Sequence, residues 1–272
     1  MADGEQELQA IVRAALRPMF RSIWRIRVTG VENIPATGGA ILTPNHTSVI
    51  DSFFLPAAAP RPVSFVGKAE YLDDWKTRKL FPALGMIPID RSGGDASQRA
   101  LDTAARVLES GDLFAIYPEG TRSRSGFLHK GHTGAARLSI RTGCPIVPVG
   151  IKGARSIQPP DQPVPNVFRP VEIHFGTPVH PAASDSVSDQ RLRLRQITDE
   201  VMFEIRALTG QDYVNEYAGK TPPPAAQAPH TTVSPEMPER RSSADVLKPV
   251  PAQRYPISRS NVTPRGRGAP VA

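Results

Sequence analysis

The sequence predicts an α/β fold in which helices flank a mixed, largely parallel β-sheet. Between residues 28 and 218, short apolar runs alternate with longer segments whose apolar residues recur at helical spacing. Short apolar runs are typical of strands buried on both faces, and amphipathic segments between them are typical of helices that cover a sheet. The chain has 272 residues, of which 39% are hydrophobic, and this is enough for one large domain or two modest ones.

Six strands and four helices are expected in this region. The strands are predicted at residues 40–43, 63–66, 86–89, 113–117, 146–151 and 171–175. The helices are predicted at residues 51–58, 95–109, 133–141 and 189–208. In the last helix Ile197, Val201, Ile205 and Leu208 share one face, and Gly210 suits the C-terminal cap.

A basic amphipathic helix is predicted over about residues 7–27. Its apolar residues between Leu8 and Ile23 recur at the spacing of one helical face. Its arginines recur every fourth residue beside that face, at Arg13, Arg17, Arg21 and Arg25. Such a helix can lie in a membrane interface with its arginines at anionic headgroups, or it can pack on its own domain with a solvated arginine edge. Pro18 would kink the helix or divide it into two.

The chain is therefore predicted to divide into three regions: residues 1–27, a folded region at 28–218 and a tail at 219–272. Eleven of the 29 prolines lie in the tail among few apolar residues, so we expect a disordered, basic, Pro-rich segment. It would serve either as a solubilising extension or as a contact for a membrane surface or a partner. The net charge of +7 comes from the two ends, because residues 28–218 contain 20 basic and 20 acidic side chains. A neutral folded region argues against a nucleic-acid partner.

Several other classes of protein are disfavoured. No run approaches the roughly 18–20 uncharged apolar residues of a membrane-spanning helix, and the N-terminus lacks the pattern of a secretory signal. The single cysteine, Cys144, excludes an internal disulfide framework and a cysteine metal cluster, and it fits a reducing cytoplasm. His129 and His132 have no acidic or cysteine partner nearby in the sequence, so no metal site is expected.

The sharpest local feature is the segment NHTSVID, which directly follows the predicted strand at residues 40–43. Polar loops at the ends of strands are where α/β proteins place functional groups. His46 could act as a general base, and Asp51 could hold its ring through the other nitrogen. The same spacing also fits a helix capping box, in which Asp51 bonds to a backbone N–H near Ser48. Spacing alone leaves both interpretations of Asp51 open.

Three further segments place polar groups at strand ends: GMIPIDR, YPEGTRS and IVPVG. Arg91 and Arg122 would supply forked donors for a phosphate, and Glu119 could accept hydrogen bonds from a polyol. Gly120 and Thr121 would let the backbone approach a ligand closely. Taken singly, Arg91 could instead pair with the neighbouring Asp90 on the surface, and Glu119 with Gly120 could form an ordinary turn.

In this order, the four segments NHTSVID, GMIPIDR, YPEGTRS and CPIVPVGI resemble the lysophosphatidic acid (1-acylglycerol-3-phosphate) acyltransferase family. The resemblance covers about residues 30–176, and it departs from the family where Tyr117 replaces a common phenylalanine. It implies a fold of the glycerolipid acyltransferase type with His46 and Asp51 as the catalytic pair. His46 would remove the proton of an acceptor hydroxyl, which then attacks the thioester of acyl-CoA or acyl carrier protein, without a cofactor, a metal or a covalent acyl-enzyme.

The resemblance also assigns the remaining site residues and the setting. It implies that glycerol phosphate is bound by Arg91, Glu119, Gly120, Thr121 and Arg122. The product would be phosphatidic acid for phospholipid synthesis. Because acceptor and product are membrane lipids, the resemblance favours the first helix as a peripheral anchor at the cytoplasmic face of the cell membrane. The acceptor could also be glycerol 3-phosphate, another lysophospholipid or a glycolipid precursor, and a non-catalytic membrane-surface adaptor is the remaining alternative.

Overall fold

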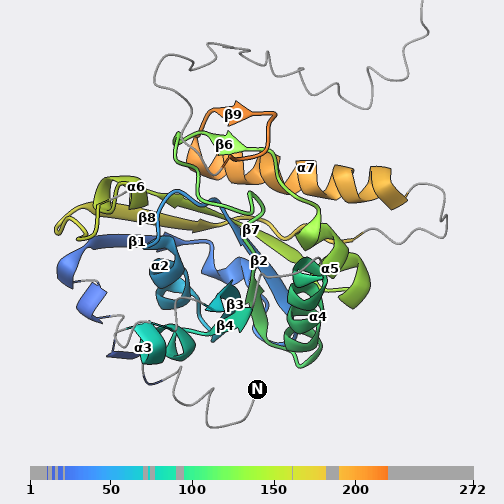
Figure 1. Cartoon of the computed structure of the whole chain (residues 1–272), viewed down its shortest axis with the longest axis horizontal. Coiled ribbons are helices and arrows are strands. Elements are labelled where there is room, and N and C mark those ends of the chain that lie inside the picture. Colours follow the sequence, from blue (N-terminus) through green and yellow to red (C-terminus); the bar gives the residue numbers. More distant parts are fainter. Residues whose placement is uncertain are drawn as a thin grey trace, which may run out of the picture. The chain divides into compact units, whose positions relative to one another are not determined.

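The computed structural model describes residues 22–69, 77–89, 95–160, 162–181 and 190–219, with residues 11, 14, 15, 18–20 and 73. Within these residues a seven-stranded sheet has helices on both faces (Figure 1). The strand order is β1-β8-β7-β2-β5-β3-β4, and only the β7–β8 pair is antiparallel. The prediction of a mixed, largely parallel α/β sheet is therefore confirmed.

The strands of the main sheet are β1 (Arg25–Thr29), β2 (Ala40–Pro44), β3 (Val63–Lys68), β4 (Met86–Ile89), β5 (Leu113–Ala115), β7 (Ile146–Lys152) and β8 (Pro170–Phe175). A small parallel pair is formed by β6 (Leu128–His129) and β9 (Tyr213–Val214). The helices are α2 (Asp51–Ala58), α3 (Thr77–Ala83), α4 (Ala96–Glu109), α5 (Gly134–Thr142), α6 (Ala154–Ile157) and α7 (Gln190–Thr209), with a 3-10 turn η1 (Val31–Asn33).

All six predicted strands and all four predicted helices are present, with ends that shift by one or two residues. The sequence did not predict β1, β6, β9, α3 and α6, which are short or lie at an edge. The predicted tail at residues 219–272 and the predicted ligand Arg91 lie outside the described residues, apart from residue 219.

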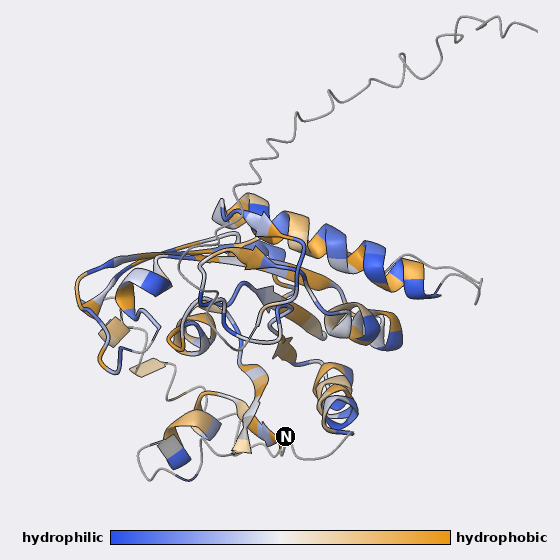
Figure 2. Cartoon of the chain, turned by 45° about the horizontal axis from the view of Figure 1, so that its top comes forward, coloured by the Kyte–Doolittle hydropathy of each residue, from blue (hydrophilic) through white to orange (hydrophobic). Residues whose placement is uncertain are grey.

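Apolar side chains fill both sides of the sheet. On one side, strand residues pack against Phe54 and Leu55 of α2, Phe81 of α3 and Ile157 of α6. On the other side, the core is built from α4, α5 and α7. Ile197, Val201 and Ile205, from the predicted apolar face of α7, are buried there. Apolar and polar residues alternate along this helix, as expected for a helix with one buried face (Figure 2). Burial from both sides fixes the strands, so the loops at their carboxyl ends are held on a rigid base.

The end of the N-terminal segment packs on its own domain. Phe20 and Trp24 are buried, and their rings meet each other and Phe54 edge to face at centroid distances of 5.4 to 5.8 Å. The Trp24 indole N–H donates to the Asn166 carbonyl at 2.7 Å. The chain then enters β1 at Arg25, so the prediction that the helix continues to residue 27 is wrong. Alternating polar and apolar residues in RIRVT suit an edge strand, and the predicted boundary after residue 27 would cut through it.

We expect Trp24→Ala to lower the free energy of unfolding by about 3–5 kcal/mol, because it empties a buried aromatic site and removes a hydrogen bond. For the same reason, deletion of residues 1–27 would damage the fold rather than leave an intact core. Urea denaturation of Met19→Ala is the matched control, since Met19 is 44% exposed and its loss should cost under about 0.5 kcal/mol. If the loss in the free energy of unfolding for Trp24→Ala were as small as that for Met19→Ala, the segment would not be part of the core.

Candidate active site

The loop after β2 is fixed by a buried asparagine before it reaches His46. Asn45 donates to the Ile151 carbonyl at 3.0 Å and to the Gln211 amide oxygen at 2.8 Å, and its own oxygen accepts from the Ile151 N–H at 2.8 Å. These bonds tie the end of β2 to its neighbour β7 and to the chain beyond α7. The position of the His46 backbone is therefore set by the sheet, a role that the sequence did not indicate for Asn45.

His46 and Asp51 form the pair that the sequence predicted. The His46 Nδ1 atom lies 3.1 Å from Asp51 Oδ2, and the side chains of His46 and Asp51 are 15% and 0% exposed. The same carboxylate oxygen accepts the backbone N–H groups of Thr47 and Ser48, each at 2.8 Å. One oxygen therefore contacts the imidazole and also closes the turn before α2, so the geometry is compatible with both interpretations of Asp51. A ring that donates its Nδ1–H to a carboxylate presents a basic Nε2.

Tyr117 covers one face of the His46 ring. The two rings stack with centroids 3.9 Å apart and planes inclined by 25°, and the Tyr117 hydroxyl lies 3.2 Å from the Ser52 hydroxyl. Burial and the charge of Asp51 raise the pKa of Tyr117 far above its ordinary value, so the phenol stays neutral. Tyr117 thus limits the tilt of the imidazole without adding charge.

Glu119 holds the backbone of the site. Its Oε1 accepts the His46 N–H and its Oε2 accepts the His129 N–H, both at 3.0 Å, and its side chain is 1% exposed. Both carboxylate oxygens face the protein, so the side chain is not placed to receive a polyol, contrary to the prediction. Burial raises the pKa of Glu119 to about 7, although the two N–H bonds favour the charged form.

This burial predicts a pH-dependent stability. A raised folded-state pKa means that the folded chain binds more protons than the unfolded chain between about pH 4.5 and pH 7. The stabilising contribution of the protonated Glu119 side chain is fully present below pH 4.5. It is lost as the pH rises through 7, which lowers the free energy of unfolding by about 3 kcal/mol. We expect Glu119→Gln to remove this slope from urea unfolding measured at several pH values, and the exposed Glu216→Gln to keep it. An unchanged slope in Glu119→Gln would assign the titration to another group.

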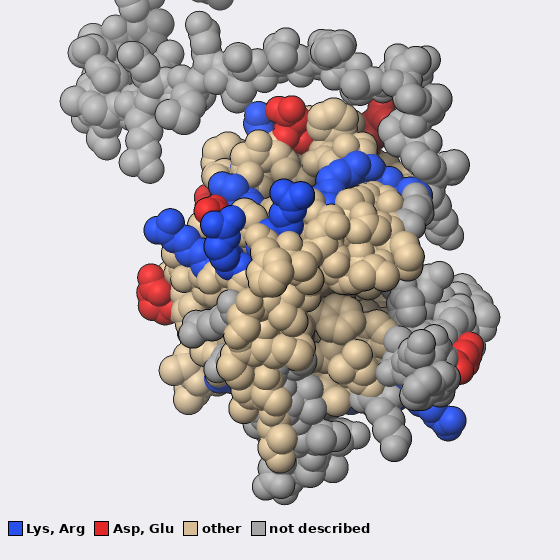
Figure 3. All heavy atoms as spheres, turned by 90° about the vertical axis from the view of Figure 1, so that its left-hand side faces the viewer, with Lys and Arg blue, Asp and Glu red and all other residues tan. Residues whose placement is uncertain are grey.

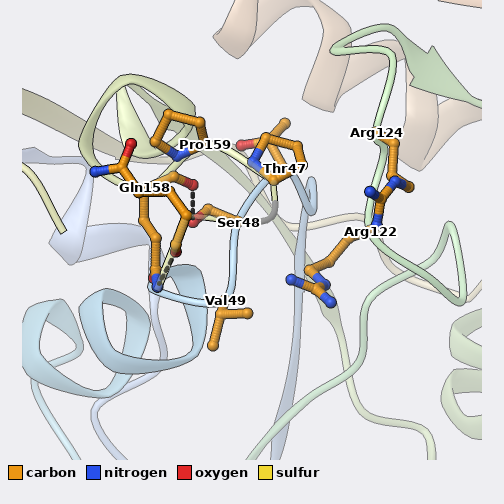
Figure 4. Close-up of a pocket in the computed structure, with 9 residues that line it drawn as sticks. Thr47, Ser48, Val49, Arg122, Arg124, Gln158 and Pro159 are labelled. Atoms are coloured by element: carbon orange, nitrogen blue, oxygen red, sulfur yellow. Dashed lines mark hydrogen bonds between the residues drawn. The ribbon is translucent and has the colours of Figure 1, made fainter. Parts of the chain in front are cut away.

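A small, open pocket lies beside the His46 loop. Its lining residues are Thr47, Ser48, Val49, Arg122, Arg124, Gln158, Pro159, Pro160 and Gln162. Arg122 extends from its loop toward Thr47 and Val49, and Arg124 follows it on the same loop (Figure 4). The Ser48 hydroxyl donates to the Gln158 carbonyl at 2.8 Å and closes one side of the pocket. Two guanidinium groups that line one pocket suit an anionic ligand such as a phosphate.

The loop that carries these arginines is anchored at both sides. The Ser123 N–H donates to the His46 carbonyl at 2.7 Å, and the Arg155 guanidinium donates to the Arg124 carbonyl at 2.8 Å. Arg124 is a pocket residue that the sequence did not predict, although it stands two residues beyond Arg122. The loop and the His46 turn are therefore joined, and the backbone that carries the arginines is fixed relative to the backbone of His46.

Gly120 and Thr121, two of the predicted ligands, lie outside this pocket. Gly120 has a φ of 72°, and a Cβ there would lie 3.0 Å from the His132 ring. This position needs glycine for the turn itself. Neither Gly120 nor Thr121 lines the pocket. Among the predicted ligands that the structure describes, Arg122 is the one that does. Within the described part of the chain, no group of three His, Cys, Asp or Glu side chains could hold a metal ion, and no helix is long and apolar enough to span a membrane.

Residues 25–152 match the family model of a domain described as Acyltransferase. The domain contains β1 to β7 with His46, Asp51 and Arg122. A 1-acyl-sn-glycerol-3-phosphate acyltransferase of Limnanthes douglasii is 35% identical over 129 residues, which cover 47% of this chain and 45% of that protein. An uncharacterised protein of Mycobacterium bovis is 33% identical over 165 residues, which cover 55% of this chain and 43% of that protein.

The fold has a counterpart among solved structures. The 1-acyl-sn-glycerophosphate acyltransferase PlsC from Thermotoga maritima superposes with a TM-score of 0.56, at 24% sequence identity, over 76% of this chain and 84% of that one. At this identity the likeness concerns the fold. The chain spans less than half the length of the two curated relatives described above.

Proposed function

We propose that the protein transfers an acyl group from acyl-CoA or acyl carrier protein to the free hydroxyl of 1-acylglycerol 3-phosphate, giving phosphatidic acid. The observation that carries this proposal is the His46–Asp51 pair, at 3.1 Å, beside a pocket lined by Arg122 and Arg124. The pair supplies a base with a fixed tautomer, and the arginines supply donors for a phosphate. The relatives named 1-acyl-sn-glycerol-3-phosphate acyltransferase support this acceptor.

The mechanism follows from the two groups. His46 Nε2 takes the proton of the acceptor hydroxyl as its oxygen attacks the thioester carbonyl carbon, and Asp51 stabilises the resulting imidazolium. The tetrahedral intermediate collapses with cleavage of the carbon–sulfur bond, and the departing thiolate takes the proton back from the imidazolium. Arg122 and Arg124 hold the phosphate so that the hydroxyl lies within reach of the base. No cofactor is consumed in this sequence of steps.

The acceptor can be identified by an acyl-transfer assay with the purified protein. Labelled acyl-CoA and acyl carrier protein would each be offered with 1-acylglycerol 3-phosphate, glycerol 3-phosphate, other lysophospholipids and a glycolipid precursor. We expect the highest kcat/KM for 1-acylglycerol 3-phosphate, and a lower value for lysophospholipids that lack a terminal phosphate. Absence of transfer to every lysophospholipid would exclude the proposed acceptor, and absence of transfer to any acceptor would favour the adaptor alternative.

We further propose that the protein acts as a peripheral protein at the cytoplasmic face of the cell membrane. The predicted amphipathic helix supports this location, as do the exposed side chains of Ile11 and Met19, which are 66% and 44% accessible. Deletion of residues 1–17 is the suitable test, because it spares Phe20, Trp24 and β1. Sedimentation with anionic vesicles should fall for this variant, and sedimentation equal to that of the full chain would count against the helix as the anchor.

A further inference from the structure

The loop between α6 and β8 exposes a cluster of large apolar side chains. Val164, Val167 and Phe168 are 68%, 53% and 71% exposed. A single exposed apolar residue is ordinary on a protein surface, whereas three within five residues form a patch that typically marks an interaction site. We call these three side chains the apolar loop tip.

Backbone hydrogen bonds hold this loop against the domain, while the three side chains remain exposed. Phe168 has a φ of 59°, and it is the single non-glycine residue with positive φ in the described part of the chain. Its N–H donates to the Ile23 carbonyl at 2.8 Å, and the Asn166 N–H donates to the Ile157 carbonyl at 2.7 Å. The inner side of the loop is therefore bound to the domain, and the left-handed turn directs the phenyl group away from it.

Two exposed arginines lie next to the apolar loop tip along the backbone. Arg169 follows Phe168 directly and is exposed, and the Arg169 carbonyl accepts the N–H of Arg25, which is also exposed. A band of Lys and Arg side chains crosses the face of the molecule that includes α6 and the outer strands (Figure 3). Apolar side chains flanked by cations match the boundary between the acyl chains and the headgroups of an anionic bilayer.

The same loop begins at the pocket and touches the N-terminal segment. Gln158, Pro159, Pro160 and Gln162 line the pocket at the start of the loop. Farther along, the Asn166 carbonyl accepts the Trp24 indole N–H, where the N-terminal segment enters β1. A bilayer that receives the apolar loop tip would therefore lie beside the pocket, where a membrane-borne acceptor has to enter.

We infer that Val164, Val167 and Phe168 insert into an anionic lipid bilayer and form a second membrane contact beside the N-terminal helix. This inference rests on the proposed function, because it supplies the route by which a lipid acceptor reaches Arg122 and His46. The contact adds affinity for the membrane and fixes which side of the domain faces it.

The test uses the full chain with vesicles of phosphatidylcholine and phosphatidylglycerol. Phe168→Asn is the informative variant, because asparagine tolerates the left-handed backbone and so keeps the turn. We expect its vesicle partition coefficient to fall about tenfold. Phe203→Asn is the matched control, since Phe203 is 63% exposed on α7, outside the α6–β8 loop, and it should stay within about twofold of the wild type.

Two readouts separate this inference from the proposed function. Vesicle binding is measured without an acyl donor, so it is independent of catalysis. Acyl transfer is then measured on vesicle-borne and on soluble short-chain 1-acylglycerol 3-phosphate, and Phe168→Asn should lose rate on vesicles alone. A Val164→Ser/Val167→Ser variant gives the same comparison with Phe168 in place. Vesicle binding equal to the wild type in both variants would overturn the inference, as would a wild-type dimer that Phe168→Asn splits without a change in vesicle binding.

Discussion

Replacing His46 with glutamine should lower kcat by about 10²–10⁴-fold and leave the protein folded. Glutamine fills much of the space of the imidazole against Tyr117, but it cannot take a proton from an acceptor hydroxyl. The loss should appear in kcat with little change in KM, because the substitution leaves untouched the arginine pocket that we propose as the phosphate site. Steady-state acyl transfer over a range of acceptor concentrations measures both constants.

The control for this substitution is His180→Gln, which makes the same chemical change at an exposed position. It should have the kcat of the wild type, and both variants should unfold within about 0.5 kcal/mol of it in urea. Retention of more than about a tenth of the wild-type kcat in folded His46→Gln would exclude His46 as the general base. The site would then contribute to the reaction only by positioning the acceptor through Arg122 and Arg124.

The sequence predicted the geometry of the candidate site best where local signals agree. The apolar strand β2, the polar loop with His46 and the start of α2 are adjacent in the chain, so their contacts follow from short-range geometry. The convergence of this loop with the YPEGTRS loop followed from parallel pairing of β2 and β5, whose carboxyl ends share an edge. The fold class was predictable for the same reason, since each buried strand is an apolar run.

The direction of individual side chains was less predictable. Glu119 stands in the expected loop, but its carboxylate turns inward to the N–H groups of His46 and His129, which are far apart in the sequence. Asn45 and Tyr117 likewise act through partners that only the folded chain brings together. Whether a polar residue faces a ligand or the backbone depends on such long-range contacts, and local spacing does not encode them.

The sequence pattern also assigned the start of the edge strand β1 to a helix. Arg25 continues the arginine spacing of the preceding helix, so the pattern predicted a helix through β1. The strand forms because its backbone pairs with β8, which lies more than a hundred residues later in the chain. Tertiary pairing here overrides a local helical pattern, as is common for edge strands.

The Asp51→Asn protein should combine a large loss of kcat, about 10²–10⁴-fold, with a loss of about 1–3 kcal/mol in the free energy of unfolding. Asp51 Oδ2 receives three hydrogen bonds, from the His46 ring and from the N–H groups of Thr47 and Ser48, in a fully buried position. The neutral amide weakens all three and no longer stabilises an imidazolium. Activity assays and urea denaturation of the same preparation measure the two losses.

The two roles of Asp51 can be separated by a double-mutant cycle with His46→Gln. If Asp51 acts on catalysis through His46, then Asp51→Asn should reduce kcat little further in the His46→Gln background. The cost in stability should persist there, because the bonds to the Thr47 and Ser48 N–H groups do not involve the imidazole. Additive losses of kcat would show that Asp51 acts on the reaction independently of His46. A nearly fully active Asp51→Asn protein with reduced stability would leave the carboxylate with its helix-capping role alone.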